Sequence, residues 1–100
     1  MNFNGAVTLI ERTYANDDYG IQRATTKTKT VFCNVESISS SEFFNASQEG
    51  LKPEYRFIIY SFEYSGESLV QYNGERLNVY RTFQRSKDLI ELYTTKDAGS

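Results

Sequence analysis

Alternating apolar and polar residues predict β-strands along most of this chain. A run of strand-forming residues extends over Val7–Tyr14, and the turn formers Asn16–Gly20 follow it. The next stretch, Ile21–Val35, is rich in threonine and ends in an alternation that places Cys33 in phase with Val31. We therefore expect an early strand, a turn, and a second strand that is long or bent, with the cysteine in the core.

One segment departs from the strand pattern and predicts the only helix that we expect. Ser39 precedes Glu42 by three residues, the spacing at which a serine hydroxyl accepts from the first turn while the glutamate reaches back to the cap. Gly50 then supplies a left-handed stop, and Pro53 holds the residue before it extended. The helix is expected over Ser40–Glu49, with Phe43, Phe44 and Ala46 as its apolar residues.

The second half of the chain predicts four more strands, two of which form a tight hairpin. Residues 54–63 are largely apolar on both faces, which is typical of a central strand or of one covered by another subunit. Asn73 and Gly74 tolerate positive φ and lie between two short strands, so a two-residue turn pairs Tyr72 with Glu75 and Val70 with Leu77. A strand over Leu89–Tyr93 and a loose polar tail over Thr94–Ser100 complete the pattern.

These elements predict an all-β, mainly antiparallel fold: a small β-barrel of about six strands with one short helix inserted between the early and central strands. The chain has 100 residues and no linker or internal repeat, so residues 1–100 are expected to form a single domain. Apolar residues make up 39% of the sequence, and fifteen residues are phenylalanine or tyrosine, which is enough to build one core without tryptophan.

Charge and composition then narrow the chemistry. The net charge is −2, there is no histidine, and Cys33 is the single cysteine. These counts exclude an internal disulfide and the usual histidine base or metal ligand, and they predict a protein that is no enzyme and holds no metal. Gly66 and Gly74 are isolated, so no phosphate-binding loop and no cofactor is expected. The chain starts without a basic region followed by an apolar run and contains no membrane-length apolar stretch, which predicts synthesis in a cytoplasm and no membrane contact.

Two alternative functions rest on scattered side chains. A small carboxylate-dependent hydrolase would use some of the acids Asp17, Asp18, Glu63, Glu67, Glu75 and Glu91, although solvated turn and surface acids explain their positions more simply. A small nucleic-acid-binding β-barrel would combine exposed rings with a basic stripe formed by Arg56, Arg76, Arg81, Arg85 and Lys87. The acidic net charge argues against the second alternative.

The apolar surplus favours a protein partner instead. Two neighbouring phenylalanines on a short helix, together with a strand that is apolar on both faces, exceed what one small barrel needs to bury. Each exposed ring forgoes about 1.5 to 3 kcal/mol of burial, so several exposed rings promote association.

The order of the motifs over residues 7–96 resembles that of the head-tail joining proteins (head-closure or stopper proteins, head-tail adaptors) of long-tailed bacteriophages and prophages. The resemblance rests on the order and spacing of the following segments: Tyr19–Gly20, Val35–Ile38, Ser41–Ala46, Gly50–Glu54, Glu63–Glu67, Val70–Gly74, Val79–Thr82 and Asp88–Tyr93.

The resemblance implies a virion protein of the neck, between head and tail, made in the host cytoplasm. Its copies would form a ring that contacts portal and adaptor proteins above and tail-completion or tail-tube proteins below. DNA would pass through the channel without specific binding, and the ring would close the channel in some members. Residues 37–54 would correspond to the segment that faces the channel and can rearrange. Within this segment the candidate channel or partner residues are Ser41, Glu42, Phe43, Phe44, Gln48, Leu51, Lys52 and Pro53.

Overall fold

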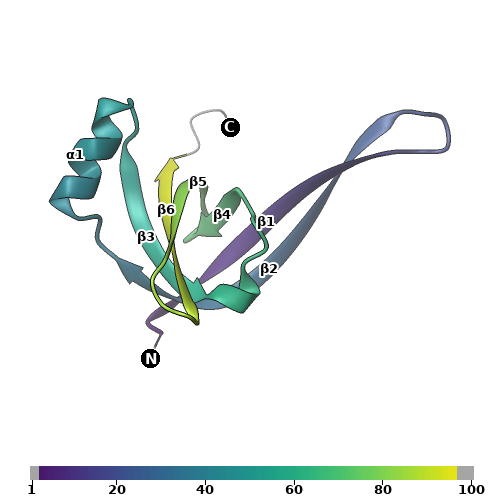
Figure 1. The fold of residues 1–100 in the computed structure, drawn as a ribbon. Helices are drawn as coiled ribbons and strands as arrows, with labels where there is room; N and C mark the ends of the chain where they lie inside the picture. Colours follow the sequence, from purple (N-terminus) through teal and green to yellow (C-terminus); the bar gives the residue numbers. More distant parts are fainter. Residues whose placement is uncertain (1–2, 97–100) are drawn as a thin grey trace.

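The computed structural model describes residues 3–96 as a closed antiparallel β-barrel with a helix on one side and a long hairpin projecting from the other (Figure 1). The strands lie around the barrel in the order β1-β2-β3-β6-β5-β4. This confirms the predicted all-β barrel with one short helix between the early and central strands. The elements within the described residues are β1 (Gly5–Asn16), β2 (Gln22–Glu36), α1 (Ser40–Gln48), β3 (Pro53–Tyr60), the 3-10 helix η1 (Ser61–Glu63), β4 (Leu69–Tyr72), β5 (Glu75–Gln84) and β6 (Leu89–Lys96).

The core fills the barrel with side chains from all six strands. Its buried members are Val7, Leu9, Val31, Cys33, Phe57, Ile59, Val70, Leu77 and Leu92. Cys33 is fully buried, as its phase predicted, and burial raises the pKa of its thiol to about 11. The thiol therefore stays protonated at neutral pH and serves as a small apolar core group.

The β4–β5 hairpin has the predicted register. Tyr72 pairs with Glu75 and Val70 pairs with Leu77, which places Val70 and Leu77 in the core. The two turn residues, Asn73 and Gly74, have φ values of 51° and 78°. A left-handed backbone at both positions matches the twist of the flanking strands, and only residues such as Asn and Gly adopt it at low cost.

The structure extends and shortens several predicted strands. β3 ends at Tyr60 rather than Glu63, because the Ser61 N–H donates to the Asp88 carbonyl (2.7 Å) and η1 begins there. β5 continues to Gln84 because β6 pairs with it that far. The predicted tail at residues 94–100 is wrong for residues 94–96, since β6 runs to Lys96, and its remaining residues lie outside those described.

The two apolar faces of β3 are both accounted for within the chain. β3 lies between β2 and β6, so it is a central strand. Phe57 and Ile59 face the core, and Ile58, on the opposite face, is also fully buried. The apolar surplus of this strand therefore needs no partner subunit, and the surplus that remains exposed lies elsewhere.

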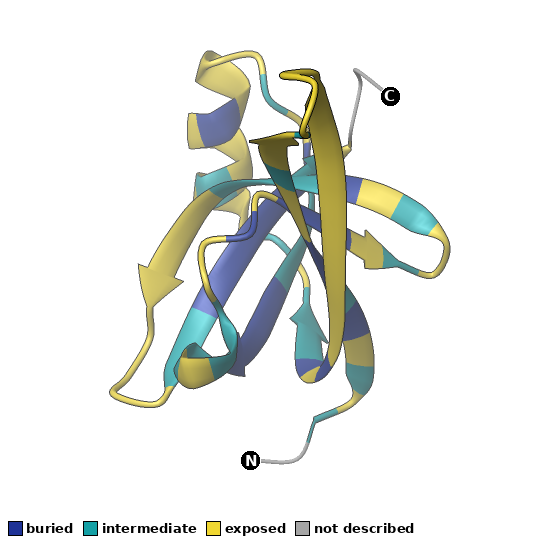
Figure 2. Cartoon of the chain, turned by 90° about the vertical axis from the view of Figure 1, so that its right-hand side faces the viewer, coloured by how far each residue is buried: buried dark blue, intermediate teal, exposed yellow. Residues whose placement is uncertain are grey.

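β1 and β2 continue beyond the barrel as a two-stranded ribbon (Figure 1). β4 pairs with β1 only as far as Ile10, whereas the β1–β2 pairing continues to Asn16 and Gln22. We call residues 11–27, which lie past the last barrel contact, the arm. Almost all of the arm is exposed (Figure 2), and the molecule reaches 50 Å along its longest axis.

Candidate interface around helix α1

Helix α1 begins at the predicted cap, but its glutamate binds elsewhere. The Glu42 N–H donates to the Ser39 hydroxyl (3.2 Å), as a serine cap requires. The sequence predicted that the Glu42 carboxylate would bind back to the cap, and this prediction is wrong. The carboxylate accepts from the Tyr80 hydroxyl (2.7 Å) and from the Arg81 guanidinium, both on β5. A hydrogen bond with a full charge on Arg81 is stronger than one with a backbone amide, which explains the difference.

Glu42, Tyr80 and Arg81 form what we call the helix anchor. Burial by itself raises the pKa of Glu42, but the hydrogen bonds from Arg81 and Tyr80 outweigh it and hold the pKa below its usual value. Burial, and next the bond to Glu42, raise the pKa of Tyr80. At neutral pH Glu42 is therefore ionised and accepts hydrogen bonds, and the Tyr80 hydroxyl is protonated and donates one. Ala46 is the buried residue of α1, so the helix is held to the barrel along one narrow side.

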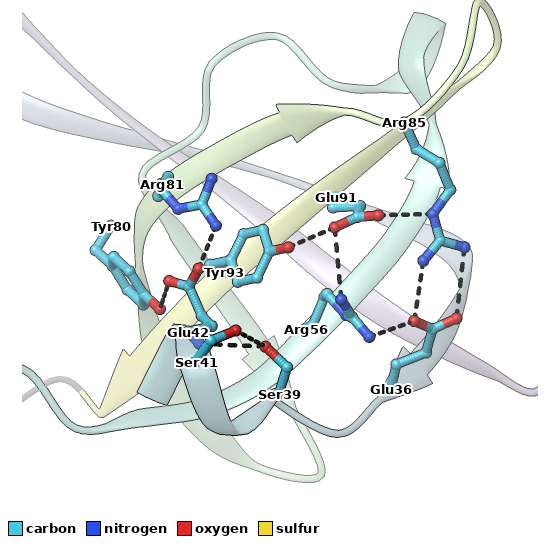
Figure 3. Close-up of polar contacts among 10 residues, drawn as sticks. All are labelled: Glu36, Ser39, Ser41, Glu42, Arg56, Tyr80, Arg81, Arg85, Glu91 and Tyr93. Atoms are coloured by element: carbon cyan, nitrogen blue, oxygen red, sulfur yellow. Dashed lines mark hydrogen bonds and ion pairs between the residues drawn. The ribbon is translucent and has the colours of Figure 1, made fainter. Parts of the chain in front are cut away.

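The helix anchor is continuous with a charged layer on the outside of the barrel (Figure 3). The Arg81 guanidinium lies over the Tyr93 ring, 4.1 Å from its centroid, and Arg56 approaches the same ring at 5.9 Å. The Tyr93 hydroxyl donates to Glu91 (2.6 Å). Cation–π contacts of this kind are worth about 0.5 to 2 kcal/mol, so Tyr93 links the anchor to the acids beyond it.

Glu91 and Glu36 share the remaining cations of this layer. Arg85 donates to Glu91 (2.6 Å) and to Glu36 (3.0 Å), and Arg56 lies 2.9 Å from Glu36. Glu91 is 5% exposed; burial raises its pKa, but the bonds from Tyr93 and Arg85 outweigh this effect and leave the pKa lowered. The layer thus connects β2, β3, β6 and β5, which are consecutive around the barrel.

The outer side of α1 is apolar and faces solvent. Phe43 is 48% exposed and Phe44 is 64% exposed. With Ile38, Ser40 and Ser47 they line a hollow of about 410 Å³. We call this the α1 hollow. Exposed apolar side chains of residues 37–54 lie together in this hollow, whereas the helix anchor lies on the inner side of the helix.

The predicted segment residues divide between these two sides. Phe43 and Phe44 face outward, Glu42 faces the barrel, and Ser41 and Gln48 are exposed. Leu51 lines a groove between α1 and β5, the Lys52 carbonyl accepts from the Thr95 hydroxyl (2.9 Å), and Pro53 is buried as the first residue of β3. Leu51 and Lys52 thus lie in the connection from α1 to β3, and Pro53 begins β3. The outward surface is formed by the helix.

The helix anchor was not predicted from the sequence, because its members are far apart in the chain. Tyr80 and Arg81 lie 38 and 39 residues after Glu42. No local pattern relates them, and the capping-box spacing offered Glu42 a nearer partner. Consecutive strand residues normally face opposite sides, so no sequence signal pointed to the joint use of Tyr80 and Arg81, and the register shift between Val79 and Arg81 is seen only in the pairing of β5 with β6.

The predicted basic stripe is largely occupied by carboxylates. Arg56 and Arg85 pair with Glu36 and Glu91, and Arg81 pairs with Glu42. The paired carboxylates offset the positive potential of these arginines and weaken their attraction for phosphates. This lowers the support for nucleic-acid binding to this face.

One of the acids proposed for a hydrolase, Glu67, lines a cleft of about 790 Å³ at the base of the arm. Glu11 and Glu67 lie there with Arg12 and Arg76, and Glu67 accepts from the Ser65 N–H (2.6 Å). Within residues 3–96 no cluster of three or more His, Cys, Asp or Glu residues could hold a metal ion. The carboxylate-dependent hydrolase stays a prediction, with no further support from the mixed charges of this cleft.

The sequence matches neither a family model nor a curated protein. Among the helices of the described part of the chain, none is long and apolar enough to cross a membrane.

Proposed function

We propose that this protein is a structural subunit of a bacteriophage or prophage neck. Its copies form a ring that joins the portal and adaptor of the DNA-filled head to the tail. The order of sequence motifs supports this proposal, and the observation that carries it in three dimensions is the exposed α1 hollow. Helix α1 is fixed to the barrel along one side, and its two phenylalanines face outward.

This arrangement suits a subunit that binds other proteins. Exposed rings that are clustered on a fixed helix present apolar area without the cost of ordering a loop on binding. The helix anchor maintains that presentation, because Glu42 is held by two donors on β5. Ring neighbours, adaptor or tail proteins would cover Phe43 and Phe44 in the assembled neck.

The test at the level of the virion is deletion of the gene. We expect filled heads and complete tails that fail to join, together with binding of the purified protein to its cognate portal–adaptor complex. A normal yield of infectious particles after deletion would overturn the proposal.

The test at the level of the residue is Phe44→Ser. We expect ring assembly, measured by sedimentation or electron microscopy, to fall while the monomer still melts cooperatively, because Phe44 is 64% exposed. Phe62→Ser is the matched control, since Phe62 is 80% exposed on η1, away from α1. Loss of monomer folding in Phe44→Ser would instead assign the Phe44 side chain to the core.

A further inference from the structure

Two asparagine–glycine sequences occur in the chain, and each follows an aromatic residue. Residues 3–5 read Phe-Asn-Gly, and residues 72–74 read Tyr-Asn-Gly. Asparagine before glycine is the sequence most prone to deamidation, because glycine has no side chain to hinder the approach of its own backbone nitrogen. Since the two local sequences are so similar, the folded structure decides which asparagine reacts.

Asn4 is held through both its side chain and its main chain. The Oδ1 atom of Asn4 accepts from the Val35 N–H (2.9 Å), and the Asn4 N–H donates to Asn34 Oδ1 (3.0 Å). Gly5, whose nitrogen would have to react, is the first residue of β1 and pairs with the buried Cys33. Reaction at Asn4 therefore requires these contacts between the start of the chain and β2 to open.

Asn73 lies in the opposite situation. Asn73 and Gly74 are both exposed at the end of the β4–β5 hairpin, and within residues 3–96 the Asn73 side chain has no hydrogen-bond partner. An added Cβ at Gly74 would meet no atom within 4 Å, so the turn is open to water on that side. The turn can therefore rearrange at these two residues without loss of a core contact.

We propose that Asn73 is a site of spontaneous deamidation in the folded protein, and that the fold protects Asn4. The Gly74 backbone nitrogen attacks Asn73 Cγ and forms a new C–N bond. The Cγ–Nδ2 bond breaks, and ammonia leaves with the proton of the attacking nitrogen. The resulting succinimide takes up one water, which opens the ring at either of its two carbonyl carbons. The products are aspartate and isoaspartate at position 73.

The two products have different consequences for the hairpin. Aspartate keeps the normal backbone and tolerates positive φ, as asparagine does. Isoaspartate places an additional carbon in the main chain, so a two-residue turn no longer matches the pairing of Tyr72 with Glu75. Because β4 also pairs with β1 and closes the barrel, we expect the altered turn to lower the stability of the whole barrel.

Incubation of the folded protein at mildly alkaline pH, followed by digestion with trypsin and mass spectrometry, tests the proposal. Trypsin cleaves after Arg12 and Arg76, so the two sites lie on separate peptides, and fragment ions identify the reacting asparagine. We expect deamidation at Asn73 to be about tenfold faster than at Asn4 or more, the factor for first breaking one hydrogen bond. A rate at Asn73 no higher than that at Asn4 would overturn the proposal.

Concentrated urea provides the matched control, because unfolding removes the contacts of Asn4 and leaves both local sequences unchanged. In urea the two asparagines should react at similar rates, through faster reaction at Asn4. A preference for Asn73 that persists undiminished in urea would assign it to the local sequence rather than to the fold, and would contradict the proposed protection.

Thermal melting measures the consequence for the hairpin. Asn73→Asp reproduces the aspartate product and should melt close to the unmodified protein. The isoaspartate form, separated from aged protein by ion-exchange chromatography, should melt at a lower temperature. Equal melting temperatures of all three forms would contradict the expected effect of the longer main chain on the hairpin.

Discussion

Strands β1 and β2 pass through two different environments, and the comparison of their two ends separates local from tertiary effects. In the barrel, Val7 pairs with Val31, and both are buried. In the arm, the same ladder continues through pairs such as Thr13–Thr25, and nearly every residue is exposed. The backbone hydrogen-bond pattern is shared, so what differs is the apolar burial.

Strand pairing by itself therefore does not account for the stability of this molecule. An isolated two-stranded ribbon is marginally stable in water, and here the arm is supported at one end by the closed barrel. We therefore expect stability to be concentrated in the barrel.

The largest expected effect is in the barrel core. Phe57 is fully buried, so Phe57→Ala should lower the free energy of unfolding by about 3 to 5 kcal/mol. Phe32→Ala is the matched control, because Phe32 is 71% exposed on β2 and should cost less than about 1 kcal/mol. Chemical denaturation measures both, and similar losses would break the comparison between barrel and exposed strand.

Acid should weaken the barrel through Glu91 and Glu42. Their folded-state pKa values are lowered, so their stabilisation is complete above the unfolded-state pKa of about 4.3 and is lost as the pH falls through the folded-state value. Each hydrogen-bonded charge contributes on the order of 1.5 to 3 kcal/mol. Denaturation at pH 7 and at pH 3 measures the loss.

Glu91→Gln should reduce this acid dependence, because the variant has no carboxyl group to protonate at that position. Asp17→Asn should leave the acid dependence of the barrel unchanged, since Asp17 lies at the arm tip, away from the core. An equal effect of the two variants would show that the arm and the barrel unfold as one unit.

Two glycines with nearly the same φ offer a sharper comparison. Gly74 in the barrel hairpin has φ 78° and Gly20 at the arm tip has φ 77°. Valine in a left-handed conformation costs about 1 to 2 kcal/mol, so Gly74→Val should lower the melting temperature. Gly20→Val should open the arm tip and leave the barrel melting temperature nearly unchanged. An unaltered melting temperature in Gly74→Val would contradict the observed hairpin register.

The smallest expected effect is on the arm surface. Thr26→Ala should change the free energy of unfolding by less than about 0.5 kcal/mol, because Thr26 is exposed. Thr94→Ala should cost about 1 kcal/mol or more, since Thr94 is fully buried and its hydroxyl donates to the Tyr55 carbonyl (3.0 Å). Denaturation curves of the two variants should therefore separate, and coincident curves would contradict the assignment.

Elements with local signals could be predicted from the amino-acid sequence. The Asn73–Gly74 turn set the hairpin register, Ser39 set the start of α1, and the phase of Cys33 placed it in the core. These three predictions are correct because a turn, a helix cap and the two-residue period of a strand each depend on residues that are neighbours in the sequence.

The point at which β1 and β2 stop being buried, and the pairing of distant charged side chains, depend on how the strands close into the barrel. The threonine-rich residues before Val31 form a regular strand in either environment, so the sequence did not distinguish the arm from the barrel. The partner of Glu42 was chosen by the approach of β5, which brings Arg81 within reach across 39 residues. Burial and ion pairing depend on distances between segments remote in the chain, and the closed order of the barrel strands sets those distances.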